Sequence, residues 1–153
     1  MRKFPFFILL FTVLQADIVN QGRAYEYFLK GEYALLNKNY SKAEIEYSKA
    51  LSLAPNSPTI LQSLVDLKSY QGEYADAIKY LEKIIELEPE NKKSCIELFQ
   101  LYIEDGNQDY AHKLLDTLLK NYPGDGELLY ALANIQYSKQ DWTNLLKTYY
   151  TYI

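Results

Sequence analysis

The chain has 153 residues, of which 48% are hydrophobic and 24% charged, and its formal net charge is −4. This composition is typical of a folded domain and argues against a long disordered segment. The negative charge offers no general positive field for a phosphate backbone, so we expect no nucleic acid among the partners. One Cys and one His can form neither an internal disulfide nor a four-ligand zinc site, so we expect no metal and no cofactor.

The first sixteen residues have the features of a secretory signal peptide. Two basic residues stand at positions 2 and 3, an apolar stretch runs from Phe4 to Leu14, and Ala16 is a small residue suited to cleavage. As a helix this stretch would rise about 16 Å, roughly half of the hydrocarbon core, so no stable membrane span is expected. The alternative is a buried or amphipathic first helix, which the lack of a polar face disfavours. We predict a signal peptide over residues 1–16, a short lead over 17–23, and export, with the bacterial periplasm or envelope as the expected location.

The remainder of the chain repeats itself every 34 residues. Prolines and alanines both keep this step, at Pro55, Pro89 and Pro123 and at Ala43, Ala77 and Ala111. Between these marks apolar residues recur at intervals of three and four, which is the period of an amphipathic helix. Each period is therefore predicted to hold two helices.

The turns between helices are marked in the same register. Lys38, Gly72, Gly106 and Gln140 share one position, and the residues after them are Asn39, Glu73, Asn107 and Asp141. Three of these four followers are favoured N-caps. The residues that precede the first helix of the later periods are also capping types, and we predict that they cap it: Ser57, Asn91 and Asp125.

These residues resemble the tetratricopeptide repeat family, whose 34-residue unit is a helix, a tight turn and a second helix. The first unit matches best, with Tyr27 at the aromatic position, Gly31 and Ala43 at the small positions, and Pro55 near its end. The resemblance implies an all-α fold, a right-handed superhelical array of antiparallel helix pairs with about 3.8 repeats. The predicted repeats are 24–57, 58–91, 92–125 and a truncated fourth, 126–153.

One cluster invites a catalytic or metal-binding interpretation. His112 lies on a predicted helix, with Asp109 three residues before it and Asp116 four residues after it, so all three lie near one face. A solvated ion pair on a helix surface is the commoner form of this pattern. Cys95 occupies the aromatic position of the third repeat and is expected to pack. Because no nucleophile stands beside a base and no glycine-rich phosphate loop is present, the chain is not expected to be an enzyme.

In the tetratricopeptide repeat family, the first helix of every unit lines a concave face that holds a partner's peptide or helix. Family members that grip a C-terminal carboxylate carry Lys and Asn where this chain has Phe28 and Glu32, so that mode is not expected. The alternative role for Phe28, Leu35 and Leu36 is contact with residues 17–23 or with the core. The resemblance implies a partner-binding groove lined by Tyr25, Phe28, Glu32, Leu35, Leu36, Gln62, Asp66, Tyr70, Ile96, Gln100, Ile103, Tyr130, Asn134 and Tyr137.

Functions of different classes remain open at this point. The favoured function is an exported scaffold or adaptor that binds a protein or peptide partner in the groove. The alternative is a cytoplasmic secretion chaperone of the type III class, because small acidic three-repeat proteins of that class hold apolar client segments. A third interpretation is that the chain is a fragment of a longer array. An intact N-terminus on cytoplasmic protein would favour the chaperone.

The last predicted helix carries an apolar stacking patch. Tyr149, Tyr152 and Ile153 match positions that the following helix covers in the earlier repeats. Because solenoids normally finish with a polar helix, an apolar patch here is expected to attract a second copy. We predict a weak homodimer through the C-terminal helix.

Overall fold

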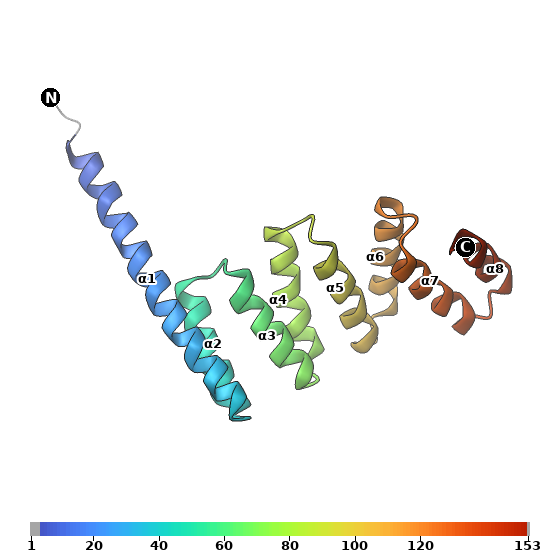
Figure 1. Cartoon of the computed structure of the whole chain (residues 1–153), viewed down its shortest axis with the longest axis horizontal. Helices are drawn as coiled ribbons and strands as arrows, with labels where there is room; N and C mark the ends of the chain where they lie inside the picture. The colour runs from blue at the N-terminus through green and yellow to red at the C-terminus, as the bar shows by residue number, and fades with distance from the viewer. Residues whose placement is uncertain (1–3, 153) are drawn as a thin grey trace. The chain divides into compact units, whose positions relative to one another are not determined.

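The structure, a computed structural model, describes the backbone of residues 4–152 and the side chains of residues 18–151. Within that part of the chain all regular secondary structure is helical (Figure 1). In chain order the helices are α1 (Phe4–Leu36), α2 (Tyr40–Leu53), α3 (Pro58–Tyr70), α4 (Tyr74–Leu87), α5 (Lys92–Glu104), α6 (Gln108–Asn121), α7 (Gly126–Ser138) and α8 (Trp142–Tyr152). The prediction of an all-α fold built from helix pairs is confirmed.

The helices form two compact units. Unit 1, Met1–Glu90, holds the hairpins α1–α2 and α3–α4. Unit 2, Asn91–Ile153, holds the hairpins α5–α6 and α7–α8. In each unit the second helix of one hairpin also packs against the first helix of the next, as α2 does on α3 and α6 on α7. Stacking of neighbouring hairpins therefore builds a separate core in each unit.

All four hairpins make the same turn. The backbone φ angle is positive at Lys38 (57°), Gly72 (75°), Gly106 (77°) and Gln140 (56°), the four positions that the sequence placed in one register. Only glycine adopts this left-handed conformation without a steric penalty. The turn is therefore strained in the first and fourth hairpins and relaxed in the second and third.

The predicted N-caps are mostly confirmed. The side chains of Ser57, Asn91 and Asp125 each accept a hydrogen bond from a backbone amide in the first turn of α3, α5 and α7. The cap prediction is wrong for Asn107, whose side-chain amide donates to the Asp105 carboxylate and makes no capping bond to α6. The Asn107 side chain turns toward Asp105 because an amide forms a stronger hydrogen bond with a charged carboxylate oxygen than with a neutral partner. The other two capping residues at this position both accept a first-turn amide: Asn39 and Asp141.

The core of unit 1 forms where α1, α2 and α3 meet. Tyr47 of α2 is fully buried, and Ala43 and Ala50 beside it are small enough to let the helices approach closely. Gly31 of α1 sits directly over the Tyr47 ring, and a Cβ atom there would lie 2.5 Å from Cδ1 of that ring. The small position of the first repeat is therefore explained by contact with an aromatic side chain.

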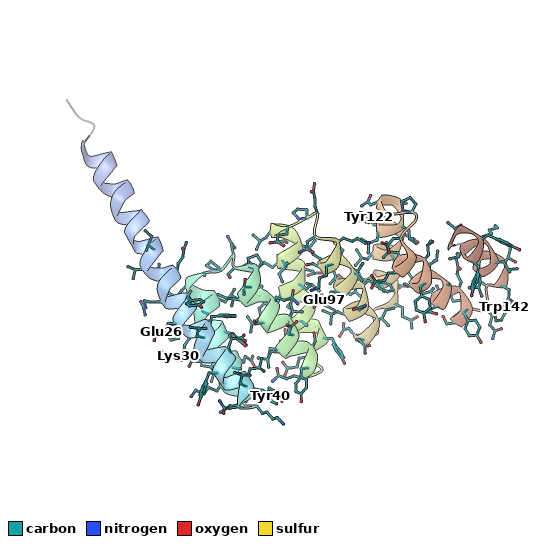
Figure 2. All side chains as sticks on the ribbon, viewed as in Figure 1. Glu26, Lys30, Tyr40, Glu97, Tyr122 and Trp142 are labelled. Carbon is teal, nitrogen blue, oxygen red and sulfur yellow. The ribbon has the colours of Figure 1, made fainter. Side chains whose placement is uncertain are left out.

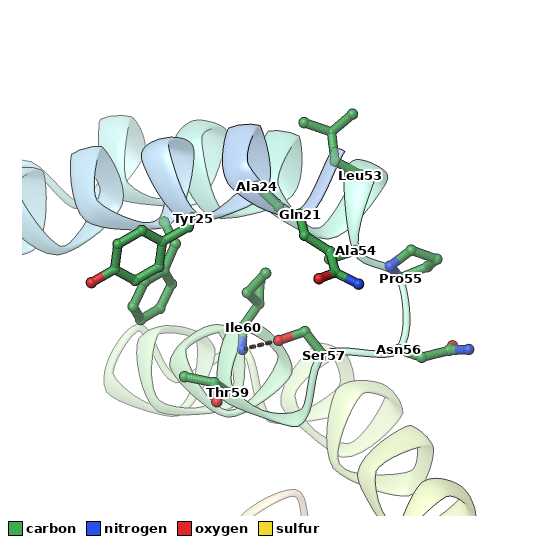
Figure 3. Close-up of a pocket in the computed structure, with 11 residues that line it drawn as sticks. Gln21, Ala24, Tyr25, Leu53, Ala54, Pro55, Asn56, Ser57, Thr59 and Ile60 are labelled. Carbon is green, nitrogen blue, oxygen red and sulfur yellow. Dashed lines mark hydrogen bonds between the residues drawn. The ribbon is translucent and has the colours of Figure 1, made fainter. Parts of the chain in front are cut away.

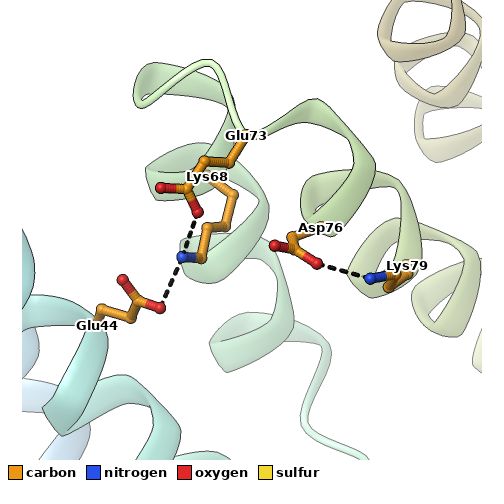
Figure 4. A network of polar contacts seen from close by, with 5 residues as sticks. All are labelled: Glu44, Lys68, Glu73, Asp76 and Lys79. Atoms are coloured by element: carbon orange, nitrogen blue, oxygen red, sulfur yellow. Dashed lines mark hydrogen bonds and ion pairs between the residues drawn. The ribbon is translucent and has the colours of Figure 1, made fainter. Parts of the chain in front are cut away.

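A buried lysine joins the two hairpins of unit 1. Lys68 of α3 is only 6% exposed, and its Nζ donates to Glu44 Oε1 at 2.6 Å and to Glu73 Oε2 at 2.7 Å (Figure 4). Burial by itself would lower the pKa of Lys68, but its hydrogen bonds to the two carboxylates outweigh burial and raise that pKa. The charged form is therefore stabilised in the folded state, and the contact ties α2 to the turn between α3 and α4.

The core of unit 2 is formed by α5, α6 and α7. Ala111 and Leu115 of α6 and Leu128 of α7 are essentially inaccessible, and Phe99 of α5 packs on them. Cys95 is half-buried against this cluster, and burial raises the pKa of its thiol. The prediction that Cys95 is a packing residue is confirmed.

The first helix is much longer than the others. It runs without a break from Phe4 to Leu36, through the residues predicted to be a signal peptide and a lead. The side chains of residues 1–17 lie outside the described part of the chain, so the predicted signal peptide stays a prediction. Among the described residues, no helix combines the length and the apolar character needed to cross a membrane.

Candidate functional site

Unit 1 contains a cleft of about 650 Å³ between α1 and the segment that joins α2 to α3 (Figure 3). Two predicted groove residues, Tyr25 and Phe28, line it from α1, and Pro55 and Ile60 line it from the other side. Tyr25 is exposed, whereas Phe28 is half-buried with its ring 5.9 Å from that of Tyr47. Tyr25 is thus available to a ligand, and Phe28 contributes both to the cleft and to the core.

Glu32, another predicted groove residue, is held by contacts inside unit 1. Its Oε1 accepts a hydrogen bond from the Tyr47 hydroxyl at 2.6 Å and another from Ser63 Oγ at 3.4 Å. Burial, followed by the bond to the Glu32 carboxylate, raises the pKa of Tyr47 well above its usual value. Glu32 therefore satisfies a buried hydroxyl, and its carboxylate is already engaged without any partner protein.

The other predicted groove residues of unit 1 fall into four environments. Gln62 Nε2 donates to Asp66 Oδ1 at 3.0 Å along the surface of α3. Tyr70 is exposed, but its ring lies 4.9 Å from that of Tyr40 of α2 and the two hydroxyls are 3.1 Å apart. Leu35 of α1 packs on the core, whereas the next residue, Leu36, is 82% exposed.

Unit 2 contains a cleft of about 770 Å³ between α5 and α7, with α6 contributing to one end. Phe99 and Leu128 form part of its apolar floor, and the exposed Tyr130 stands at its rim. Five of the six groove residues predicted in this unit line the cleft together: Ile96, Gln100, Ile103, Tyr130 and Asn134. The sixth, Tyr137, is exposed outside the cleft lining, and its ring meets that of Trp142 edge-on at 5.5 Å.

Two of the polar residues of this cleft that were not among the predicted groove residues contact each other. Lys139 Nζ lies 3.1 Å from His112 Nδ1, and both side chains line the same end of the cleft. His112 thus contacts a lysine from the next hairpin. No group of three or more His, Cys, Asp or Glu side chains among the described residues is arranged to hold a metal ion. The repeat register could not reveal the pair, because its members lie on different hairpins at unrelated positions.

Seven of the fourteen predicted groove residues line two local clefts, two of them in unit 1 and five in unit 2, and the groove as a whole stays a prediction. The C-terminal stacking patch also stays a prediction. Tyr149 is 61% exposed, whereas the side chains of Tyr152 and Ile153 lie outside the described residues.

Comparison with known proteins identifies the repeats. Sequence models of the tetratricopeptide repeat match residues 70–141 and 27–57. The cellulose synthase operon protein C of Pseudomonas fluorescens (strain SBW25) is 20% identical over 172 residues, and the match spans 85% of this chain but only 13% of that much longer protein.

Solved structures show the same fold. MamA from Desulfovibrio magneticus RS-1 is 15% identical, with a TM-score of 0.66 over 85% of this chain and 73% of that one. The first TPR domain of Spaghetti (RPAP3), bound to the HSP90 peptide SRMEEVD, is 17% identical, with a TM-score of 0.62 over 78% of this chain and 95% of that one. At identities this low, the similarity shows a shared fold and gives no information about function.

Proposed function

The chain belongs to the tetratricopeptide repeat family, and from this premise we propose that it is a protein–protein interaction scaffold that holds a partner's peptide or helix in its local clefts. The observation that carries the proposal is the unit 2 cleft of about 770 Å³, where five predicted groove residues meet. A cleft of this size is large enough for a specific ligand. An aromatic side chain at its rim, Tyr130, is 67% exposed and can anchor a partner.

The chemistry of the unit 2 cleft suits a largely apolar segment. Its floor of Phe99 and Leu128 can bury aliphatic or aromatic side chains, which is the main source of binding free energy in such sites. Two side-chain amides, Gln100 and Asn134, also line the cleft. Each offers both a donor and an acceptor to the backbone of a bound peptide. Specificity for an extended or helical segment is therefore provided by polar groups around an apolar floor.

The unit 1 cleft is unsuited to the C-terminal carboxylate of a peptide. Phe28 and Glu32 occupy the positions at which a carboxylate-gripping member of the family carries cations and amides. The Glu32 carboxylate is itself negative and is already bonded to Tyr47. The rings of Tyr25 and Phe28 line the cleft, so a partner of unit 1 is expected to present apolar groups to them.

Site-specific photo-crosslinking tests the cleft. A benzophenone amino acid in place of Tyr130 should cross-link a discrete partner when the protein is expressed in its native cells. The same amino acid in place of Lys120, which is exposed on α6 and does not line the cleft, is the matched control and should not. Equal cross-linking at the two positions, or none at Tyr130, would contradict the proposal.

We further propose that the scaffold is exported to the bacterial envelope. The basic start, the apolar stretch from Phe4 to Leu14 and the small Ala16 support this. Mass spectrometry of protein recovered from cells should find a chain that starts at Asp17 in the envelope fraction. Recovery of the chain from the cytoplasm with residues 1–16 still attached would instead favour the chaperone.

A further inference from the structure

The outer face of α1 carries an exposed apolar stripe. α1 lies at the edge of unit 1 (Figure 1). Ala24 and Ala34, on the side of α1 turned toward the core, are buried. On the opposite side five large apolar side chains are between 48% and 82% exposed: Ile18, Tyr25, Leu29, Tyr33 and Leu36. Their spacing of three, four and seven residues places them on one face of the helix, and we call them the outer stripe. Monomeric proteins rarely expose an apolar strip of this length.

The outer stripe differs from the face by which hairpins stack in unit 1. α3 packs back on α2 through Ile60, Leu64 and Leu67. The residues 34 positions earlier are Glu26, Lys30 and Tyr33, of which the first two form an exposed ion pair at 2.6 Å (Figure 2). A hairpin docked on α1 in the way that α2 docks on α3 would bury this pair, which is unfavourable. A single helix lying along the stripe would leave the pair at its flank.

We propose that the outer stripe binds the same stripe of a second copy of the chain, with the two α1 helices antiparallel and related by a two-fold axis. The proposal is independent of the unit 2 cleft and shares one residue, Tyr25, with the unit 1 cleft. Ile18 and Tyr25, and likewise Leu29 and Leu36, are seven residues apart, which is the spacing of a two-helix coiled-coil seam. In one antiparallel alignment, Ile18 lies level with Leu36 of the second copy and Tyr25 lies level with Leu29 of the second copy. A two-fold contact requires a patch that complements itself, and this stripe does so.

Two further features fit the same alignment. Gly22 lies on the same face of α1, between Ile18 and Tyr25, and has no side chain. It comes close to the level of Tyr33 of the second copy, so a large side chain lies against a residue without one. Glu26 lies about 3 Å along the helix axis from the level of Lys30 of the second copy, on the same flank. The two ion pairs therefore join into a network of alternating charge.

The size of the stripe sets the strength of the contact. The distance along α1 from Ile18 to Leu36 is about 27 Å. Five exposed side chains of this size bury on the order of 500 Å² in each copy, so the interface reaches the lower end of the range for specific complexes. The expected product is a reversible, concentration-dependent dimer.

Analytical ultracentrifugation of the protein as purified from cells, over a range of concentrations, tests the contact. The variants Leu29→Glu and Leu36→Glu should each raise the dissociation constant at least about tenfold, because they place a charge in the seam. Their melting temperatures should stay unchanged, since both side chains are exposed. The matched control is Leu146→Glu, an equally exposed leucine of α8, which should leave the dimer intact. A wild-type monomer at every concentration, or dissociation by the control alone, would overturn the proposal and in the second case would favour the C-terminal patch.

Cross-linking tests the orientation. In a Cys95→Ser background, a chain carrying Ile18→Cys mixed with a chain carrying Leu36→Cys should form a disulfide-linked pair. The Ile18→Cys chain alone should not, because its two cysteines lie at opposite ends of an antiparallel contact. Cross-linking of Ile18→Cys to itself and not to Leu36→Cys would show a parallel pair and would overturn the alignment.

Discussion

Gly31 and Tyr47 lie in direct contact, so close that any side chain at position 31 would overlap the ring. A Cβ atom on Gly31 would be 2.5 Å from both Cδ1 and Cε1 of Tyr47, a distance that real Cβ atoms do not reach. The ring itself cannot retreat, because it is fully buried and its hydroxyl is bonded to Glu32. The separation of α1 and α2 is therefore set by one glycine and one tyrosine.

This contact predicts the effect of a single methyl group. Gly31→Ala should lower the free energy of unfolding by about 1–3 kcal/mol, the usual cost of overpacking a core, even though alanine is the better helix former. Gly22→Ala, in the same helix, is the matched control, because its Cβ would meet nothing within 4 Å. It should be neutral or stabilising. Urea unfolding of both variants would measure the difference, and an equal response would show that Tyr47 can move aside.

The strained turns provide a second prediction. Lys38 and Gln140 hold positive φ angles that cost a non-glycine residue about 1 kcal/mol each. Lys38→Gly and Gln140→Gly should therefore raise the free energy of unfolding, despite the greater flexibility of glycine in the unfolded chain. The reciprocal change, Gly72→Ala, should lower it. Thermal unfolding of the three variants checks the sign of each effect, and loss of stability in both glycine variants would mean that these turns are not strained.

The stability of the fold should depend on pH through the carboxyl group of Asp125. Its side chain caps α7 and pairs with Lys92; the hydrogen bond to Lys92, followed by the bond from the Leu128 amide, lowers the pKa of the carboxyl. A group whose pKa is lowered by folding stabilises the folded state above its unfolded pKa of about 3.9, and that contribution is lost as the pH falls through the folded value.

Asp125→Asn isolates this contribution, because asparagine is an equally good N-cap but carries no charge. The melting temperature of the variant should lie below that of the wild type near pH 6, and the two should converge as the pH falls through the lowered pKa of Asp125 in the folded state. A difference that persists unchanged in acid would assign the effect to capping geometry and not to the charge.

The unit 2 cleft predicts a separation of binding from stability. Changing Tyr130 and Tyr137 together to Ala should weaken capture of the cross-linked partner, because exposed aromatic anchors dominate such contacts. The melting temperature should change little, since both side chains are more than 60% exposed. Parallel loss of both properties would show that these tyrosines support the fold. Tyr130→Ala and Tyr137→Ala as single variants then separate the cleft from the edge contact with Trp142.

The repeat register predicted the backbone well because it depends on small and turn-forming residues whose role is local. The four positive-φ turns follow from the chain's own periodicity, and the small Gly31 over Tyr47 follows from the family resemblance. The register predicts side-chain roles less well. The register places Glu32 in the groove but gives no sign that the Glu32 carboxylate accepts a hydrogen bond from the buried Tyr47 hydroxyl.

The contacts between hairpins were beyond the reach of the sequence for a related reason. Lys68 gathers carboxylates from α2 and from the following turn, and His112 meets Lys139 from the next hairpin. Neither pairing recurs in the other repeats, so periodicity contains no signal for it. Their partners depend on how neighbouring hairpins stack, and that is decided by packing.

Unit 2 carries the chain's only cysteine and its only tryptophan. Cys95 is half-buried against the unit 2 core, and Trp142 meets Tyr137 in the last hairpin. Thiol labelling and indole fluorescence therefore report on one half of the molecule, while circular dichroism reports on both. Comparing the unfolding transitions seen by these three methods would therefore show whether the two units unfold together. No residue needs to be introduced for this measurement.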